Sequence, residues 1–312
     1  GAGPRSNLTK LMLVGTAYAG NISGTAILTA AIGNILTIEI LQLYLGVTLS
    51  YFDWFLYALP IWLLLIIVIP AVLWFSYPPE PYSFEKLQKE MLEKSKKMRT
   101  LSKVEKRSIV ILTLTVLLWM TQPLHGYHPT IPALLAVVLF AFPRIGVVDW
   151  KKVVDVNFDL VLLVGATLSL GFVLIDSGAI DLLAGVVTSD IVQQAFGNPW
   201  LALCLVVIIS QIYHLGVTNV STAVVTLLPV LIGLSLEVGI DPVVIAFASA
   251  VTLLFGYILV VETMPNVVVH STGLVKQRDF YLPGILATIA TSAITLLVAY
   301  TWWRWLGFWP IG

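Results

Sequence analysis

Two polar clusters interrupt long apolar stretches of this chain, and both hold side chains suited to binding ions. The first is the turn in HLGVTNVSTAVVT (214–226), where the Asn219 amide can offer an oxygen to a cation and an N–H to an anion. Thr218, Ser221 and Thr222 add hydroxyl groups to the same turn. The segment that follows is predicted to be helical, and a helix N-terminus directed at the turn favours a carboxylate or a sulfate.

The second cluster is Glu262-Thr263-Met264-Pro265-Asn266. Pro265 lacks a backbone N–H and interrupts the helix, which leaves carbonyl groups free. Glu262 is an acid deep in an apolar run, and such an acid is a candidate carrier of a proton or a cation. The alternative is a purely structural, hydrogen-bonded acid. His214 is either a proton partner for it or a hydrogen-bonded residue of the first cluster.

A third polar group, Asn21-Ile-Ser23-Gly24-Thr25, lies in the small-residue segment Leu11–Thr37. Glycines in membrane helices often serve only close packing. Together with Asn, Ser and Thr, however, they favour a helix broken near the membrane midplane with carbonyls that face a cavity. Asn34 follows this break much as Asn266 follows the later one, which suggests an internal repeat.

The elements that carry the first cluster are short. The apolar arms Pro199–Tyr213 and Ala223–Leu234 run for about 12–15 residues, whereas a membrane span needs about 20. We therefore expect a re-entrant hairpin that enters the membrane and returns. Its polar tip is tolerated at that depth only if it lines a cavity or meets other polar groups.

Composition places the chain in a membrane. Apolar residues make up 58% and charged residues 11%, whereas soluble domains carry about 25% charged residues. The 17 basic and 17 acidic residues balance, so net charge says nothing about partners. For a membrane protein of this kind we expect no nucleic-acid partner. Cys204 is predicted to be an inert packing residue. His125 and His128 have no third ligand nearby, so we do not predict a metal site there.

Charge distribution sets the topology. The segment 78–107 is rich in Lys and Arg and is predicted to be a cytoplasmic connector of a plasma-membrane protein. Alternating the spans from there places every Lys and Arg except Arg304 inside. This strong positive-inside pattern supports the span assignment but does not distinguish a hairpin from two full spans, because both return to the outside.

Several motifs together resemble the divalent anion:sodium symporter family, which carries dicarboxylates, citrate or sulfate. AYAGNISGTAILTAAIGN (17–34) resembles its first broken helix, and YFDWFLYALP (51–60) the entry to the next span. Two segments resemble the start of its second half, namely LSKVEKRSIVILTLTVLLW (101–119) and NFDLVLLVGATLSLGFVLIDSGAID (157–181). TNVSTAVVTLLP (218–229) resembles the Ser-Asn-Thr hairpin, and ETMPNVVVHSTG (262–273) the Thr-Pro-Pro-Asn segment.

The resemblance implies an all-α polytopic membrane protein, an inverted-repeat secondary transporter with a re-entrant hairpin and broken helices. It implies elevator-type alternating access, a homodimer, a scaffold interface formed partly by 55–77 and 108–142, and no cofactor apart from Na⁺ or H⁺ as coupling ion. The implied ligands of a small anionic substrate are Thr218, Asn219, Val220, Thr263 and Pro265. The implied cation ligands are Asn21, Ser23, Gly24, Thr25, Val217, Asn219, Glu262 and Asn266, with Glu262 and His214 as candidates for proton coupling.

The chain also departs from the family pattern. Thr218 replaces Ser, Val220 replaces Thr and removes a hydroxyl, and Glu262 replaces a small residue. The family's first Ser-Asn-Thr hairpin is not found ahead of the first broken helix. We therefore expect the chain to correspond to the second half of the family fold plus the end of the first, without the first part of the N-terminal half.

The predicted segments form two repeats joined by the charged linker 78–107. The first repeat, 1–77, contains the broken helix 11–37, an interfacial helix 38–54 and a span 55–77. The second repeat, 108–312, contains spans 108–122, 131–143 and 157–176, the hairpin 199–234, the broken helix 243–269 and a last span 281–306.

Three alternative functions remain open from the sequence. One is a proton-coupled, arsenite- or citrate-type permease of the wider ion transporter superfamily that uses Glu262. Another is a non-transporting fragment or assembly subunit. An intramembrane enzyme built on His214 and Glu262 is disfavoured, because neither a Ser/His/Asp set nor an HExxH motif is present in the sequence.

Overall fold

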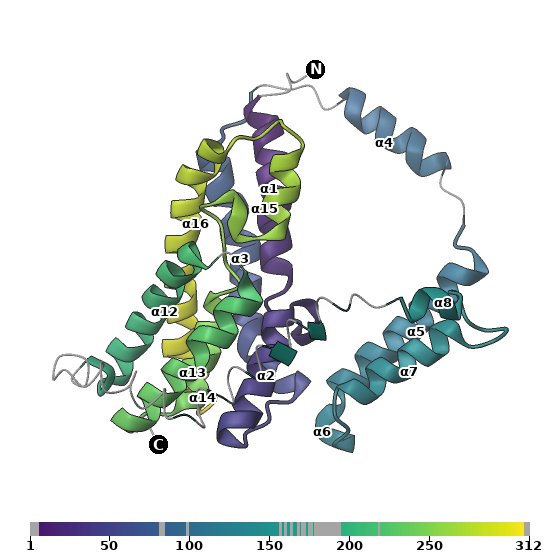
Figure 1. Ribbon diagram of the computed structural model, residues 1–312. Coiled ribbons are helices and arrows are strands. Elements are labelled where there is room, and N and C mark those ends of the chain that lie inside the picture. Colours follow the sequence, from purple (N-terminus) through teal and green to yellow (C-terminus); the bar gives the residue numbers. More distant parts are fainter. Residues whose placement is uncertain are drawn as a thin grey trace. The chain divides into compact units, whose positions relative to one another are not determined.

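Helices account for every regular element in the described part of the chain (Figure 1). The computed structural model describes residues 6–80, 85–97, 100–155, 195–217 and 219–308, with positions 158, 161, 162, 165, 166, 169, 173 and 177. Among the described residues, four helical segments are long and apolar enough to cross a membrane: Tyr51–Ser76, Pro199–Gly216, Val220–Val238 and Gln277–Trp303. The protein is thus an all-α polytopic membrane protein, as predicted.

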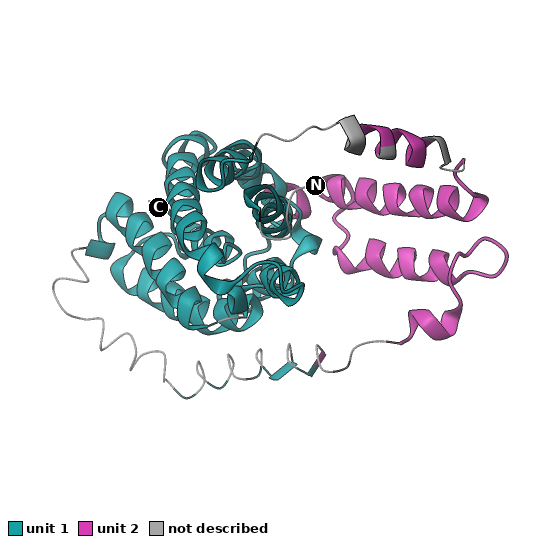
Figure 2. Cartoon of the chain, turned by 90° about the horizontal axis from the view of Figure 1, so that it is seen from above, with its two compact units in different colours: residues 1–49, 54–80, 162–312 teal, residues 50–53, 81–161 magenta. Residues whose placement is uncertain are grey.

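The chain divides into two compact units (Figure 2). Unit 1 comprises residues 1–49, 54–80 and 162–312, and unit 2 comprises 50–53 and 81–161. The helices of unit 1 are α1 (Asn7–Ser23), α2 (Ile32–Leu45), most of α3 (Tyr51–Ser76), α12 (Pro199–Gly216), α13 (Val220–Val238), α14 (Pro242–Thr252), α15 (Met264–Ser271) and α16 (Gln277–Val298). Unit 2 holds α4 (Glu85–Lys97), α5 (Lys103–Met120), α6 (Gln122–His125), α7 (Thr130–Ala141) and α8 (Trp150–Val153).

Some boundaries differ from those predicted. The expected interfacial helix 38–54 is divided between α2, which continues to Leu45, and α3, which begins at Tyr51. The hairpin arms α12 and α13 have 18 and 19 residues rather than about 12–15, because α12 continues through His214 and α13 includes polar residues at both ends, such as Ser221 and Glu237. Each arm therefore has the length of a membrane span. Most of the predicted span 157–176 lies outside the described residues.

Both predicted broken helices are interrupted by extended backbone and one 3₁₀ turn. The first break separates α1 from α2 and contains the turn η1 (Leu28–Ala30). The second separates α14 from α15 and contains η2 (Val260–Glu262). The residues just before α2 and α15, Ala31 and Thr263, are both extended, with φ −135° and −140°.

One asparagine closes each break in the same way. In the first, Asn34 Nδ2 donates to the carbonyls of Gly24 at 2.8 Å and Ile27 at 3.2 Å. In the second, Asn266 Nδ2 donates to the carbonyls of Gly256 and Leu259, both at 3.1 Å. In both cases the acceptors lie ten and seven residues before the asparagine. This matched geometry supports the repeat that the sequence suggested.

Aromatic side chains from other helices bind one further carbonyl in each break. Trp54 Nε1 donates to the Thr25 carbonyl at 3.0 Å, and the Tyr18 hydroxyl donates to the Tyr257 carbonyl at 2.8 Å. Trp54 and Tyr18 are fully buried. Backbone carbonyls released from a helix must be satisfied inside a membrane, and these two long-range bonds meet that need.

The C-terminal end of α16 binds two backbone carbonyls close to Pro60 of α3. Pro60 cannot donate to the carbonyl of Leu56, one turn earlier. Trp302 Nε1 donates to that Leu56 carbonyl at 2.9 Å, and Trp303 Nε1 donates to the next one, of Tyr57, also at 2.9 Å. Both tryptophans belong to η3 (Ala299–Trp303), a π-helical turn that continues α16.

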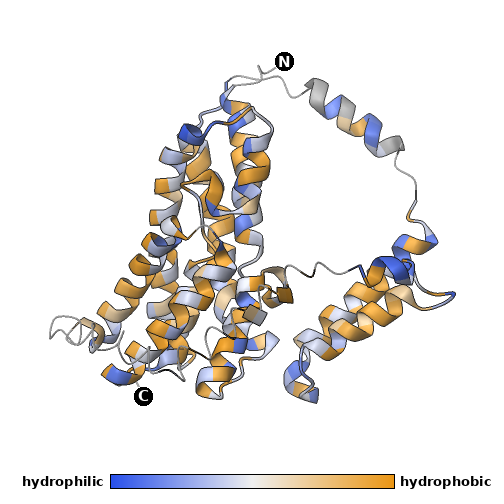
Figure 3. Ribbon diagram, viewed as in Figure 1, coloured by the Kyte–Doolittle hydropathy of each residue, from blue (hydrophilic) through white to orange (hydrophobic). Residues whose placement is uncertain are grey.

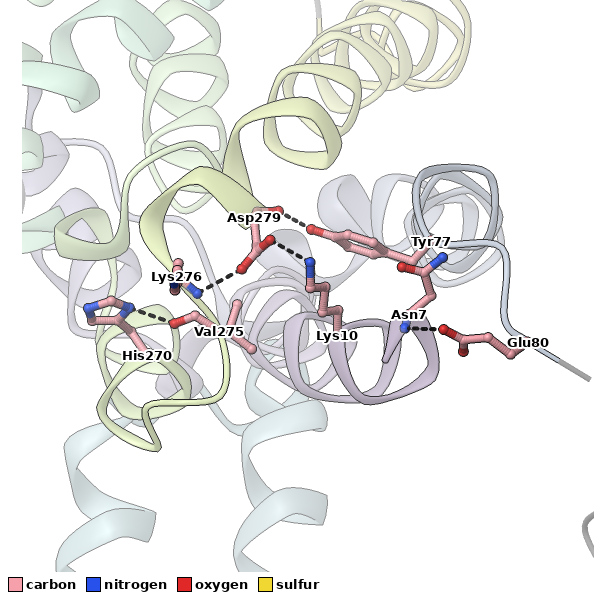
Figure 4. A network of polar contacts seen from close by, with 8 residues as sticks. All are labelled: Asn7, Lys10, Tyr77, Glu80, His270, Val275, Lys276 and Asp279. Carbon is pink, nitrogen blue, oxygen red and sulfur yellow. Dashed lines mark hydrogen bonds and ion pairs between the residues drawn. The ribbon is translucent and has the colours of Figure 1, made fainter. Parts of the chain in front are cut away.

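Polar contacts join α1, α3 and α16 at one end of unit 1 (Figure 4). Lys10 Nζ lies 2.7 Å from Asp279 Oδ1 in an ion pair, and the Tyr77 hydroxyl donates to the Asp279 carbonyl. Glu80 accepts the backbone N–H groups of Asn7 and Leu8 at 2.9 and 3.2 Å. These N–H groups, Asn7 first, lower the pKa of the exposed Glu80 carboxyl below its usual value.

In unit 2, α5 packs along α7. Helix α5 begins with a capping box between Ser102 and Glu105. Trp119 Nε1 donates to the Pro129 carbonyl at 2.8 Å, and Gln122 Oε1 accepts the Tyr51 N–H at 2.7 Å. Apolar residues predominate along the long helices of both units (Figure 3), as expected for surfaces that face lipid.

Candidate functional site

A pocket of about 320 Å³ in unit 1 brings together the three predicted polar clusters. Its walls come from the end of α1, the first break, the hairpin tip and the second break. The predicted site residues that line it are Asn21, Gly24, Asn219, Val220, Glu262, Thr263 and Pro265.

Three helices begin at this pocket. The lining includes Ile32 and Gly33 of α2, Val220 and Ser221 of α13, and Met264 and Pro265 of α15. Each helix N-terminus carries about half a positive charge and unpaired N–H groups. Among the described lining residues, Glu262 has the one ionisable side chain. The positive potential of the pocket therefore comes from the backbone.

Asn219 is placed by its own helix. It is the N-cap of α13, and its Oδ1 accepts the Thr222 N–H at 3.2 Å. The cap accounts for one lone pair of that oxygen and leaves the Nδ2 amide group for a ligand. Asn219 is exposed at the pocket. Asn219, the strongest single candidate in the sequence, is thus a helix cap that also lines the pocket.

Two buried oxygens at the pocket have no hydrogen-bond partner within the described part of the chain. They are Glu262 Oε1 and Thr263 Oγ1. The other carboxylate oxygen, Glu262 Oε2, accepts the Ile258 N–H at 3.0 Å. Glu262 is only 2% exposed. An unpartnered buried carboxylate oxygen is costly, and a bound cation or proton would satisfy it.

The amides of Asn21 and Asn266 serve the second break. Asn21 Nδ2 donates to the Gly256 carbonyl at 2.8 Å and lies 3.4 Å from Asn266 Oδ1. The Gly256 carbonyl therefore accepts from two asparagines. Because both Asn266 donors and its oxygen are engaged inside the protein, its side chain holds the break rather than facing the pocket.

His214 lies behind Gly256, away from the pocket lining. A Cβ at Gly256 would fall 2.7 Å from Glu262 Cβ and 2.9 Å from His214 Cε1. The imidazole and the acid thus approach this glycine closely, and both are buried. Glycine at 256 is required because a larger residue would collide with both side chains.

Three further predicted cation ligands, Ser23, Thr25 and Val217, do not line the pocket, and one predicted substrate ligand lies outside the described residues. The Ser23 hydroxyl donates to the Gly20 carbonyl at 2.7 Å, and Ser23 faces a separate apolar groove between α1 and α3. Thr25 is fully buried within the first break, where its Oγ1 has no partner in the described structure. Val217 follows α12 in the hairpin turn. Thr218, predicted as a substrate ligand, lies outside the described residues.

Sequence reasoning missed residues that shape the site from a distance. The sequence identifies Asn34 only as a marker of the repeat, yet its buried Oδ1 has no partner in the part of the chain that is described. The signal in the sequence that could have identified this role is that Asn34 and Asn266 stand at the same place after the two breaks. Gln277, Trp54 and Tyr18 bind the two breaks across long sequence separations, and no local pattern in the sequence identifies them.

A model of the sodium:sulfate symporter transmembrane region matches residues 3–309. A membrane protein of Cupriavidus necator is 28% identical over 99% of this chain and 61% of its own length. A citrate/succinate antiporter of Escherichia coli is 24% identical over 93% of this chain and 58% of its own.

A sodium-dependent dicarboxylate transporter of Staphylococcus saprophyticus is 22% identical over 95% of this chain and 59% of its own length. The chain therefore spans between 58% and 61% of the length of these three curated relatives. The matched region covers nearly the whole chain, including both breaks, the hairpin and the pocket between them. The protein therefore belongs to the sodium:sulfate symporter family of multi-pass membrane proteins.

Proposed function

We propose that the protein is a secondary active transporter that carries a divalent anion, a dicarboxylate, citrate or sulfate, coupled to Na⁺ or H⁺. The observation that carries the proposal is the convergence of the N-termini of α2, α13 and α15 on one pocket. Helix N-termini bind carboxylate and sulfate oxygens through free N–H groups. The Asn219 amide, the Ser221 hydroxyl and Thr263 supply further contacts at the same surface.

Charge balance requires a coupling cation. Three helix N-termini supply about 1.5 positive charges, whereas a dianion and an ionised Glu262 together carry three negative charges. A cation at Glu262 Oε1 and Thr263 Oγ1, the buried oxygens that have no partner among the described residues, reduces the deficit. Broken helices of transporters supply such oxygen ligands to Na⁺. Asn21 and Gly24 line the same pocket.

The division of the chain suggests how the loaded site moves. All residues that line the pocket belong to unit 1, whereas α4, α5 and α7 belong to unit 2. In the proposed elevator mechanism, unit 1 carries the ligands and unit 2 contributes to the scaffold of a homodimer. The segment 55–77, which is predicted to form part of the scaffold interface, belongs to unit 1.

The transport proposal is tested by uptake into vesicles that contain the purified protein. We expect radiolabelled succinate, citrate or sulfate to accumulate when an inward Na⁺ gradient is imposed, and accumulation to collapse when the gradient is dissipated. The control is vesicles without protein. Sodium-independent uptake that follows a proton gradient would assign Glu262 to proton coupling, with His214 beside it. Absence of uptake of all three anions under both gradients would reject transport by this chain.

The hairpin tip must pack closely on α2 for the pocket to form. A Cβ at Gly33 would lie 2.8 Å from Val220 Cγ1 and 3.4 Å from Val224 Cγ2. We expect Gly33→Ala to push the tip away and weaken Na⁺-dependent succinate binding about tenfold, since overpacking costs about 1–3 kcal/mol. Val220→Ala removes the colliding methyl group, so the double variant should regain most of the binding.

The matched control for this pair is Gly15→Ala, because a Cβ there meets only Leu73 Cδ1 at an ordinary 3.6 Å. Binding is measured by equilibrium titration of the purified variants with labelled succinate at saturating Na⁺. If the double variant binds as weakly as Gly33→Ala alone, the contact between Gly33 and Val220 does not set the position of the tip.

A further inference from the structure

The first residue of α16 is bound to the backbone of the second break. Gln277 Oε1 accepts the Val260 N–H at 2.8 Å, and Gln277 Nε2 donates to the Ile258 carbonyl at 3.0 Å. One side-chain amide thus pairs with two peptide groups, as a neighbouring strand would. Gln277 is half-buried and does not line the pocket, so it does not itself contact a ligand there.

The segment that Gln277 holds also holds Glu262. The Ile258 N–H donates to Glu262 Oε2 at 3.0 Å, while the Ile258 carbonyl is bound by Gln277. Both polar groups of Ile258 are therefore fixed by side chains. With Oε2 anchored in this way, the carboxylate plane is set, while the buried Oε1 of this pocket-lining residue has no partner among the described residues.

The first break is arranged differently at the corresponding positions. Asn34 and Trp54 bind its carbonyls as Asn266 and Tyr18 bind those of the second. However, Ala30, four residues before Asn34, occupies the position of Glu262, four residues before Asn266. Among the described residues, the Glu262 carboxylate and the Gln277 contacts therefore occur at the second break and have no counterpart at the first.

We propose that Gln277 is a positioning residue for the coupling cation. It fixes Ile258 and Val260, and through Ile258 it orients the Glu262 carboxylate so that Oε1 faces the pocket. This inference rests on the proposed function, in which Glu262 binds the cation. It assigns Gln277 an effect on cation affinity rather than on the anion contacts made by the helix N-termini.

The test is Gln277→Met, a side chain of similar length without hydrogen-bonding groups. The probes are Na⁺ and labelled succinate. We expect the Na⁺ concentration for half-maximal succinate binding to rise about tenfold, as for loss of one to two hydrogen bonds, while succinate affinity at saturating Na⁺ stays within about twofold. Gln277→Asn, one methylene too short to reach both peptide groups, should shift the Na⁺ requirement in the same direction.

Gln122→Met is the matched control, because Gln122 also binds a backbone N–H, that of Tyr51 at 2.7 Å, but belongs to unit 2. It should leave the Na⁺ requirement unchanged. An unchanged requirement in Gln277→Met, or weakened succinate binding that saturating Na⁺ does not restore, would overturn the inference.

Hydrogen–deuterium exchange separates this inference from the transport proposal. Peptides covering residues 256–263 should exchange faster in Gln277→Met than in the parent, because the Val260 N–H loses its acceptor. If the parent binds no dianion, the proposed function fails and exchange alone decides the role of Gln277. Unchanged exchange over 256–263 would then overturn the positioning role of Gln277, and faster exchange confined to that segment would support this role.

Discussion

Replacing Gly284 with alanine is expected to abolish Na⁺-dependent succinate binding, with a loss of at least about 100-fold. Gly284 lies on α16 against the backbone of the second break. A Cβ there would fall 2.6 Å from the Tyr257 carbonyl oxygen and 2.8 Å from Ile258 Cα. These are backbone atoms, which cannot rotate away as a side chain can, so the break itself must move.

The displacement would reach the pocket because the break is tied to it. The Tyr257 carbonyl would lose its bond from Tyr18, and a shift of Ile258 would release Glu262 Oε2. Gly15→Ala is again the matched control, since the added Cβ makes an ordinary contact. Binding is measured by titration, and gel filtration identifies variants that remain folded. A folded Gly284→Ala variant that binds within threefold of the parent would show that the second break is not a rigid part of the site.

The local sequence predicted the breaks and the hairpin tip because each is encoded by residues close together. Pro265 and the glycines of 15–33 disfavour a continuous helix, and Asn34 and Asn266 stand at the same place after each break. Within an apolar chain such residues have few roles other than close packing or lining a cavity. The clusters meet at one pocket because α1 packs on α15 and α2 packs on α13.

The supports of the breaks could not be predicted in this way. Trp54 Nε1 and the Tyr18 hydroxyl bind carbonyls 29 and 239 residues away along the chain, so tertiary contacts alone select them. In the sequence both look like ordinary aromatic residues of apolar helices. Ser23 shows the converse error, because its hydroxyl bonds to the carbonyl of its own helix at Gly20 and faces the other groove.

The hairpin arms are longer than the sequence predicts for a related reason. Apolar residues alone place the end of the first arm near Tyr213 and the start of the second near Ala223, whereas α12 continues to Gly216 and α13 starts at Val220. Polar contacts at the hairpin tip stabilise the start of α13. The Asn219 side chain caps α13, and the Tyr213 hydroxyl lies 2.8 Å from Thr226 Oγ1.

Asn219→Ala is expected to abolish cation-driven uptake of the transported anion, to less than about 1% of the parent rate. The substitution removes the Nδ2 donor at the pocket and the cap of α13 together. Loss of a cap alone costs about 1 kcal/mol of stability, which is too little to abolish transport. The remainder of the effect is therefore assigned to the missing amide donor.

Two further variants separate these contributions. Asn198→Ala removes the equivalent cap from the other arm, where Asn198 Oδ1 accepts the Trp200 N–H at 3.0 Å, far from the pocket lining. It should lower the melting temperature as much as Asn219→Ala does and leave uptake near the parent rate. Asn219→Asp keeps a capping oxygen but has no amide donor and adds a negative charge, so it should be inactive although well folded. Unchanged uptake by Asn219→Ala would reject the hairpin tip as the substrate site. Transport would then proceed without the amide that is proposed to bind the anion at the N-terminus of α13.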